Sequence, residues 1–161
     1  MERLWTPWRM EYIRSATVAE EDEGCVLCRL PGAGDDARVW ILARGALAYV
    51  VLNKYPYNPG HLMVAPFRHV GALEDVRADE LADMGELLQR AIAALRAASD
   101  PHGFNVGMNL GRAAGAGMPD HLHWHVVPRW GGDTNFMPVL GETRVLPELL
   151  DETYAKLAPH F

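Results

Sequence analysis

The sequence predicts an α+β domain with a mostly antiparallel sheet, one long central helix and a C-terminal helix. Residues 79–98 repeat apolar side chains every three or four positions, which is the period of an amphipathic helix. Strand-like runs lie on both sides of this helix along the chain. Turn-forming residues separate them. The runs are residues 39–43, 48–52, 61–66, 104–109 and 121–127.

The composition is that of one globular domain. A chain of 161 residues is long enough for one sizeable core and short for two, so we expect a single domain over residues 1–161. A net charge of −6 without a lysine or arginine cluster argues against nucleic acid as a partner. No apolar run has membrane-spanning length, and no signal peptide is recognisable at the N-terminus. We therefore expect a cytoplasmic protein without a membrane partner.

The remaining elements follow in order along the chain. Residues 1–24 form an arm with several large aromatic groups, which we expect to pack on the core or on a partner subunit. Residues 53–60 contain two prolines, two asparagines and a glycine, and so predict a shaped loop between two strands. A glycine and alanine loop at 111–117 precedes the last strand. A loop at 131–142 leads to a C-terminal helix at 146–157.

The last strand carries the strongest chemical signal. Residues 121–125 read HLHWH, and alternate residues of a strand share a face. His121, His123 and His125 should therefore project together. An imidazole serves as nucleophile, general acid or base, metal ligand or hydrogen-bond donor near neutral pH. Three together predict a site, since burying them without a task is costly. The alternative is an exposed polar strand face or a chance cluster.

Cys25 and Cys28 are the only cysteines in the chain. In a reducing compartment this C-x-x-C spacing indicates metal ligation or redox chemistry rather than a structural disulfide. Two thiolates supply half of a tetrahedral zinc site, and the other ligands have to come from elsewhere in the fold. Two reduced surface thiols are the alternative. A thioredoxin-like role has less support because no βαβ pattern surrounds the pair.

These motifs together resemble the histidine triad (HIT) superfamily. The segment HLHWHVV at 121–127 is similar to its signature, and NKYPYNPGHLMVAP at 53–66 is similar to its upstream nucleotide-binding segment. Asn109, the small-residue loop and the order of strands and long helix agree as well. The resemblance covers most of the chain and implies a HIT-like fold.

The resemblance also implies roles for individual residues. His123 corresponds to the nucleophile that attacks the α-phosphate of a nucleotide and becomes covalently nucleotidylated. His125 corresponds to the donor to phosphate oxygens and the leaving group, and His61 to a histidine beside the triad. Asn53 corresponds to the ribose-binding residue, and Val51 and Leu52 are expected to lie near the base. Taken alone, Asn53 and His61 each favour ordinary loop hydrogen bonding, and it is their spacing to one another and to the triad that favours a site.

The loop before the triad is expected to bind phosphate. Small residues let backbone amides approach an anion closely, although ordinary turns use the same residues. In hydrolytic relatives a glutamine that orients water stands where this chain has Gly117, and its loss leaves room for inorganic phosphate. Trp130 corresponds to a further substrate-binding residue. The expected substrate-binding set is Asn53, Leu52, Asn109, Gly115, Ala116, Gly117 and Trp130.

The whole-chain pattern is most similar to short bacterial diadenosine tetraphosphate (Ap4A) phosphorylases of this superfamily. It implies phosphorolysis of dinucleoside polyphosphates to ADP and ATP, by a covalent step that needs no metal. The histidine at position 125 favours hydrolysis instead, because the more distant transferases of the superfamily carry glutamine at this third triad position. A hydrolase or phosphoramidase that uses water therefore stays open. A zinc-stabilised nucleotide-binding protein with little turnover is the alternative from another class.

The resemblance completes the zinc site and suggests an assembly. Some relatives bind structural zinc through a cysteine pair, a histidine after the 61–66 strand, and the first triad histidine. The corresponding set here is Cys25, Cys28, His69 and His121. The aromatic arm, and a sheet that extends across subunits in the family, imply a homodimer or larger homo-oligomer.

Overall fold

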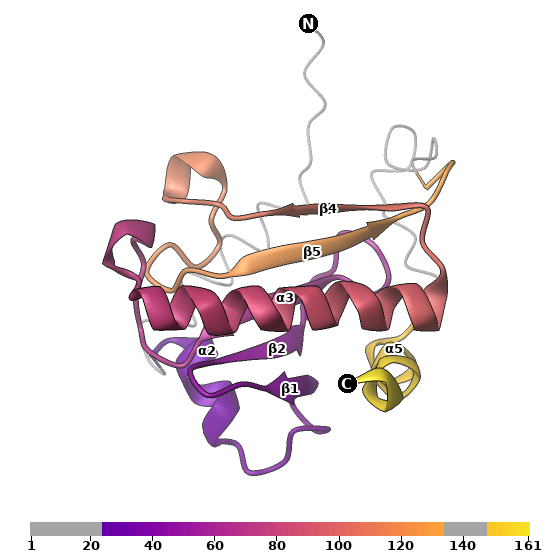
Figure 1. Ribbon diagram of the computed structural model, residues 1–161, viewed down its shortest axis with the longest axis horizontal. Helices are drawn as coiled ribbons and strands as arrows, with labels where there is room; N and C mark the ends of the chain where they lie inside the picture. The colour runs from indigo at the N-terminus through magenta and orange to yellow at the C-terminus, as the bar shows by residue number, and fades with distance from the viewer. Residues whose placement is uncertain (1–23, 134–147) are drawn as a thin grey trace, which may run out of the picture.

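The computed structural model describes residues 24–133 and 148–161, so the predicted N-terminal arm and most of the predicted 131–142 loop lie outside the described residues. Five antiparallel strands form one sheet in the order β1-β2-β3-β5-β4 (Figure 1). The strands are β1 Ile41–Arg44, β2 Ala48–Leu52, β3 Leu62–Pro66, β4 Gly103–Gly107 and β5 Trp124–Arg129. The α-helices are α2 Val26–Arg29, α3 Ala78–Ser99 and α5 Leu150–Leu157. The α+β class and the central helix are confirmed.

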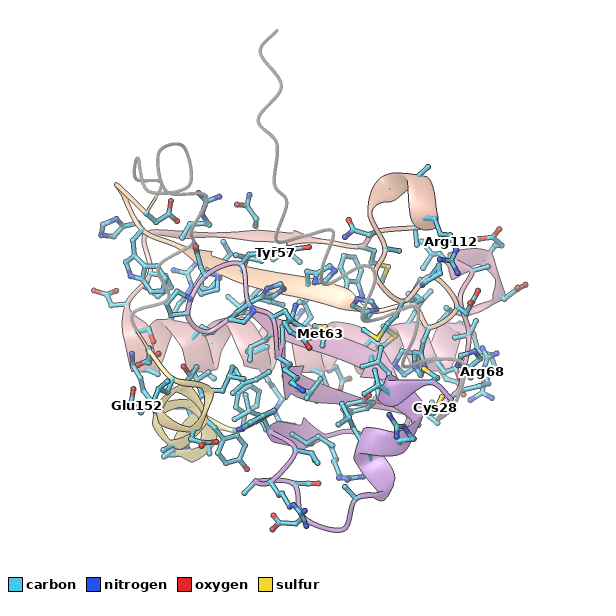
Figure 2. All side chains as sticks on the ribbon, turned by 180° about the vertical axis from the view of Figure 1, so that it is seen from behind. Cys28, Tyr57, Met63, Arg68, Arg112 and Glu152 are labelled. Atoms are coloured by element: carbon cyan, nitrogen blue, oxygen red, sulfur yellow. The ribbon has the colours of Figure 1, made fainter. Side chains whose placement is uncertain are left out.

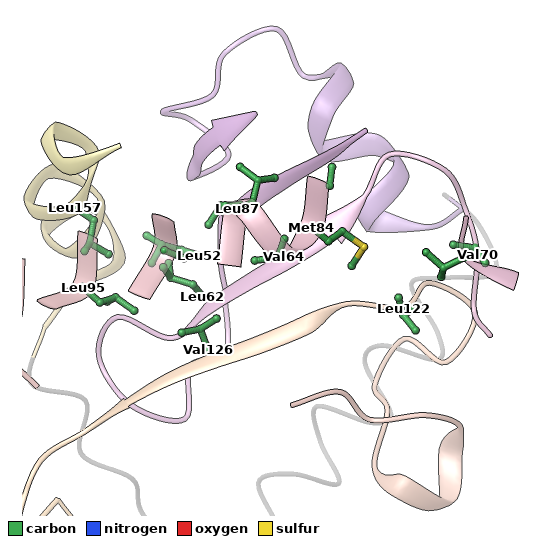
Figure 3. Packing of buried hydrophobic residues seen from close by; sticks show 14 residues of the cluster. Leu52, Leu62, Val64, Val70, Met84, Leu87, Leu95, Leu122, Val126 and Leu157 are labelled. Atoms are coloured by element: carbon green, nitrogen blue, oxygen red, sulfur yellow. The ribbon is translucent and has the colours of Figure 1, made fainter. Parts of the chain in front are cut away.

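The long helix α3 covers one face of the sheet and buries the main core (Figure 1). Its 3–4 spacing turns Met84, Leu87 and Leu95 inward, and each of these is at most 2% exposed. Strand residues such as Val64 and Val126 meet them from the sheet (Figure 3). Burial of each leucine contributes roughly 1.5–3 kcal/mol. Because α3 covers one face of the sheet, only side chains on the opposite face of each strand can contribute to a site.

The opposite face carries a second, smaller core beneath α2. Leu27 of this helix packs with Tyr49 and Met63, and the Tyr49 hydroxyl donates to the Leu27 carbonyl at 2.6 Å. Strand pairing aligns Val51 with Met63, and Met63 with His125, on this same face. The short α2 thus sits beside the histidines, which brings the cysteines toward the triad.

Several predicted boundaries were wrong. Strand β5 begins at Trp124 rather than at residue 121, because the amide of Leu122 donates to the Val70 carbonyl at 2.7 Å, outside the sheet. Helix α5 begins at Leu150 rather than at 146. The Glu152 carboxylate accepts the Leu149 amide at 3.2 Å and caps the helix there. Residues 146 and 147 lie outside the described part of the chain.

Strand β4 also ends earlier than predicted, at Gly107 instead of residue 109. The pair Gly107–His125 is the last of its ladder with β5. Asn109 consequently belongs to the loop that leaves the sheet beside the histidines. Over the described residues, no helix combines the length and the apolar character required to cross a bilayer.

Candidate active site and metal centre

The sheet brings three histidines together on the face away from α3. His123 and His125 alternate with Leu122 and Val126, which are buried in the α3 core. His61 directly precedes β3, whose Met63 pairs with His125. The ring centroids of His123 and His125 lie 4.7 Å apart, and those of His61 and His125 lie 5.1 Å apart. The predicted clustering of His61, His123 and His125 is therefore present in the structure.

The main chain sets the protonation pattern of His123. Its Nδ1 lies 2.8 Å from the carbonyl oxygen of His121. A carbonyl only accepts, so Nδ1 carries the proton and Nε2 carries a lone pair. His123 is 6% exposed, and burial lowers its pKa, which favours the neutral ring. A neutral imidazole with a free Nε2 lone pair is the form that attacks an electrophile.

A chain of hydrogen bonds gives His125 the opposite tautomer. The Tyr57 amide donates to Nδ1 of His61 at 3.0 Å, so a neutral His61 is protonated on Nε2. That nitrogen lies 3.0 Å from Nδ1 of His125 and donates to it. The proton of a neutral His125 therefore sits on its Nε2. Nδ2 of Asn109 lies 3.5 Å from that nitrogen and is itself a donor, so the two atoms form no hydrogen bond in this tautomer. His125 thus presents an N–H donor beside the lone pair of His123.

Asn53 lies at the end of β2, beside His61. Its Oδ1 accepts the Tyr55 amide at 2.9 Å, which shapes the loop, and its Nδ2 lies 3.4 Å from Nδ1 of His61. Leu52 is placed differently from the expectation. It is 2% exposed within the α3 core, on the other face of the sheet, whereas Val51 lies on the histidine face. The structure does not bring Leu52 to the histidines.

The small-residue loop closes partly on itself. Gly111 and Gly115 adopt left-handed φ values of 78° and 89°. The amides of Gly115 and Ala116 donate to carbonyls of the same loop, at 3.0 and 3.3 Å. Among residues 24–133 and 148–161, no hydrogen bond is recorded from the Gly117 amide. In this conformation Gly117, rather than Gly115 or Ala116, has an amide available for an anion.

An ion-pair network holds the turn that carries Trp130. The Asp133 carboxylate accepts from Nη2 of Arg129 at 2.8 Å and from the Trp130 amide at 3.3 Å. It also accepts from Nδ2 of Asn58 at 2.9 Å, which ties this turn to the loop before His61. The Arg129 hydrogen bonds hold the pKa of Asp133 well below its usual range. The Arg129 charge is thus neutralised inside the protein.

Sequence reasoning missed Tyr57, Asn58 and Asp133 as contributors to the site. Their roles depend on contacts between loops, which leave no periodic pattern in the sequence. The only available signal was the tyrosine and asparagine content of residues 53–60, next to a functional histidine.

The predicted metal ligands meet beside the triad. The ligand atoms of Cys25, Cys28, His69 and His121 all lie within 4.8 Å of one another. Sulfur to Nδ1 distances are 3.3 Å for Cys25–His121, 3.4 Å for Cys28–His121 and 3.3 Å for Cys28–His69. Tetrahedral zinc, with bonds of about 2.3 Å to sulfur and about 2.0 Å to nitrogen, requires about 3.5 Å between such ligands.

The protonation pattern of this cluster also fits a metal. Nε2 of His121 donates to the Pro66 carbonyl at 2.9 Å, which leaves Nδ1 as the lone pair facing the thiols. Burial lowers the pKa of His121 and so favours its neutral, ligating form. Burial and the neighbouring Cys25 raise the pKa of Cys28 to about 11. A divalent cation would reverse that shift, since it binds the thiolate.

Comparison with known proteins agrees with this geometry. The model of the HIT domain matches residues 40–132. AP-4-A phosphorylase of Mycobacterium tuberculosis is 47% identical over 163 residues, covering 98% of this chain and 83% of that protein. A bis(5'-adenosyl)-triphosphatase/adenylylsulfatase of Arabidopsis thaliana is 33% identical over 54% of this chain and 48% of its own. A zinc-bound histidine triad family protein from Mycobacterium smegmatis superposes with a TM-score of 0.68, at 26% identity, covering 84% of this chain and 91% of that one.

Proposed function

From the membership of this chain in the HIT domain family, we propose that it is a nucleotidyltransferase that cleaves diadenosine tetraphosphate by phosphorolysis. The 47% identity to an AP-4-A phosphorylase over nearly the whole chain supports this substrate. The observation that carries the chemistry is the pair of opposite tautomers. His123 offers an Nε2 lone pair and the adjacent His125 offers an Nε2 proton. A nucleophile and a hydrogen-bond donor therefore stand side by side.

The first half-reaction uses both groups. Nε2 of His123 attacks the α-phosphorus, a P–N bond forms, and the bond from phosphorus to the bridging oxygen breaks. The bridging oxygen leaves as an oxyanion of ATP and accepts a hydrogen bond from Nε2–H of His125, which keeps its proton. In the second half-reaction an oxygen of inorganic phosphate attacks the same phosphorus, the P–N bond breaks and ADP is released. Splitting one displacement into two lowers the barrier of each, and neither step requires a metal.

The acceptor assignment depends on Gly117. We assign the second anion to the Gly117 amide, for which the described residues record no hydrogen bond. Asn109, 3.5 Å from Nε2 of His125, is placed to orient the phosphate chain. On the nucleoside side we assign Asn53 to the ribose, and Val51 rather than Leu52 to the base. We also assign Trp130, whose main-chain amide donates to Asp133, to substrate binding.

We also propose that zinc occupies the Cys25, Cys28, His69 and His121 cluster. Four protein ligands complete the tetrahedron, so no position is left for substrate and the metal is structural. Such a thiolate pair needs a reducing compartment, which supports a cytoplasmic location. Strand β4 lies at the edge of the sheet and Val106 on it is 41% exposed, which supports a homo-oligomer that continues the sheet.

Product analysis tests this function. The zinc-loaded protein is incubated with diadenosine tetraphosphate, with and without inorganic phosphate, and nucleotides are separated by anion exchange. We expect equal ADP and ATP, formed only with phosphate. AMP and ATP at a rate that ignores phosphate would instead identify the water-using hydrolase. Activity that survives His123→Ala, with His160→Ala as the matched histidine control, would remove His123 as the nucleophile. A parent protein that binds the dinucleotide without forming any product would be a binding protein only.

A further inference from the structure

Tyr57 contacts both histidines of the hydrogen-bonded pair His61 and His125 through its main chain and its ring. Its amide donates to Nδ1 of His61 at 3.0 Å. Its ring centroid lies 4.7 Å from that of His61 and 5.9 Å from that of His125, with interplanar angles of 35° and 33°. Tyr57 lies with Met63 on the side of the sheet away from α3 (Figure 2). The ring thus lies against two imidazoles joined by a 3.0 Å hydrogen bond.

The loop is anchored on both sides of Tyr57. Asn58 donates from Nδ2 to the Pro128 carbonyl at 3.0 Å and to Asp133 at 2.9 Å. Oδ1 of Asn53 accepts a hydrogen bond from the Tyr55 main-chain amide at 2.9 Å. The main-chain amide of Asn53 donates to the His61 carbonyl at 2.9 Å. Bonds to β5, to the 130–133 turn and to His61 itself therefore fix where Tyr57 stands. Such supporting contacts are what a preorganised site requires.

We propose that Tyr57 is a positioning residue that keeps the hydrogen-bonding proton of His125 on Nε2, acting through His61; this inference rests on the proposed function. The amide is a permanent donor, because a peptide N–H does not ionise near neutral pH, so His61 is held as the Nε2–H tautomer. The ring covers the bond between the imidazoles and excludes water, which would otherwise supply Nδ1 of His125 with a competing partner.

The consequence falls on one chemical step. When the α-phosphorus to oxygen bond of the substrate breaks, the leaving oxygen gains negative charge and accepts a hydrogen bond from Nε2–H of His125. A His125 ring with its proton on Nδ1 presents only a lone pair to that oxygen and cannot stabilise it. Loss of the Tyr57 ring therefore lowers the rate of bond cleavage and leaves nucleotide binding nearly unchanged. Removal of one preorganised donor to a developing oxyanion costs roughly 10²–10³-fold, which bounds the possible loss.

Three variants test the proposal. Tyr57→Ala keeps the main-chain amide and removes the ring, whereas Tyr57→Phe keeps both. The control is Tyr55→Ala, which removes another ring of the same loop. The Tyr55 side chain is 51% exposed and its ring lies 5.8 Å from the Lys54 ammonium. We expect Tyr57→Ala to lower kcat for diadenosine tetraphosphate phosphorolysis at least about tenfold, with KM within about twofold. Tyr57→Phe should restore most of that loss, and Tyr55→Ala should match the parent protein.

A spectroscopic readout separates positioning from packing. Imidazole ¹⁵N signals of the substrate-free, zinc-loaded protein should show His125 protonated on Nε2 in the parent and in Tyr57→Phe, and a mixture of tautomers in Tyr57→Ala. An unchanged tautomer pattern in Tyr57→Ala, or an equal kcat loss in the Phe and Ala variants, would overturn the proposal. If the parent protein turns over no substrate, the proposed function fails, while the ¹⁵N pattern still decides the role of Tyr57.

Discussion

Nε2 of His61 lies 3.0 Å from Nδ1 of His125, and this contact makes the triad chemically asymmetric. His123 is bonded through Nδ1 to a carbonyl, which accepts, whereas His125 accepts a hydrogen bond at Nδ1 from Nε2–H of His61. Two rings of the same residue type thus hold their protons on opposite nitrogens. The division into nucleophile and hydrogen-bond donor follows from their neighbours.

His61→Phe should test this asymmetry. Phenylalanine fills the buried position, since His61 is fully buried, but it donates no proton to His125. We expect kcat for phosphorolysis to fall about 100-fold, because His125 loses the partner that fixes its tautomer. Steady-state kinetics with diadenosine tetraphosphate measures this change.

The control for that variant is a histidine outside the site. His160→Ala removes an exposed ring near the C-terminus and should leave kcat unaltered. Circular dichroism of both variants checks that the sheet is retained. A folded His61→Phe protein with parental kcat would show that His125 needs no help from His61.

Gly117→Gln should move the reaction toward water. The φ of Gly117 is not positive, so the backbone accepts a side chain. A glutamine here fills the space assigned to the attacking phosphate and restores the amide that orients water in hydrolytic relatives. We expect the ratio of ADP to AMP to fall at least about tenfold, equivalent to about 1.4 kcal/mol between the two acceptors.

Product ratios at fixed phosphate concentration give this result directly. Gly117→Ala is the matched control, because it adds a methyl group without an amide and should keep ADP as the main product. Gly117→Gln that still yields only ADP and ATP would remove Gly117 as the determinant of the acceptor.

Local signals predicted the fold class, the order of elements and the inward face of α3. The apolar 3–4 repeat that buries Met84, Leu87 and Leu95 is visible within one helix. The start of β5 was not predictable in that way. It depends on the bond from the Leu122 amide to the Val70 carbonyl, 52 positions earlier in the chain, and no periodicity reports such a contact.

In the site, too, some features follow from local sequence patterns and others depend on tertiary contacts. The spacing of His121, His123 and His125 placed two of them correctly beside one another. The tautomers required the His121 carbonyl, His61 and the Tyr57 amide, which only tertiary structure brings together. Leu52 was assigned to the nucleotide because it adjoins Asn53, and strand alternation sends it to the other face.

Metal content tests the four-ligand cluster. We expect about one zinc per chain by elemental analysis of the purified protein, and loss of that zinc in Cys28→Ser and His69→Ala, because three ligands bind it far more weakly. The melting temperature should fall in both variants, since metal binding is coupled to the folded state. Adding a chelator should reproduce that fall in the parent protein.

A histidine that binds no metal serves as the control for these variants. Nδ1 of His102 accepts the Gly131 amide at 2.8 Å, away from the cysteines, so His102→Ala should keep its zinc. Parental zinc content in Cys28→Ser would refute the ligand set.

Acid sensitivity tests the buried carboxylate of Glu80. Its side chain is 2% exposed and accepts from Nε and Nη2 of Arg68 at 2.8 and 2.7 Å. The Arg68 hydrogen bonds lower the pKa of Glu80 from 4.5 to about 2. A pKa lowered in the folded state stabilises the fold above the unfolded pKa, and this contribution is lost as the pH falls from about 4.5 to 2.

Glu80→Gln should therefore reduce the free energy of unfolding at pH 7 by an amount on the order of 3 kcal/mol, and the difference from the parent should shrink toward zero near pH 2. Urea unfolding followed by circular dichroism at several pH values measures both quantities. Glu86→Gln, on the exposed side of the same helix, is the control and should unfold like the parent throughout. A Glu80→Gln deficit that stays constant from pH 7 to pH 2 would mean that shape, and not the charge paired with Arg68, is what the position contributes.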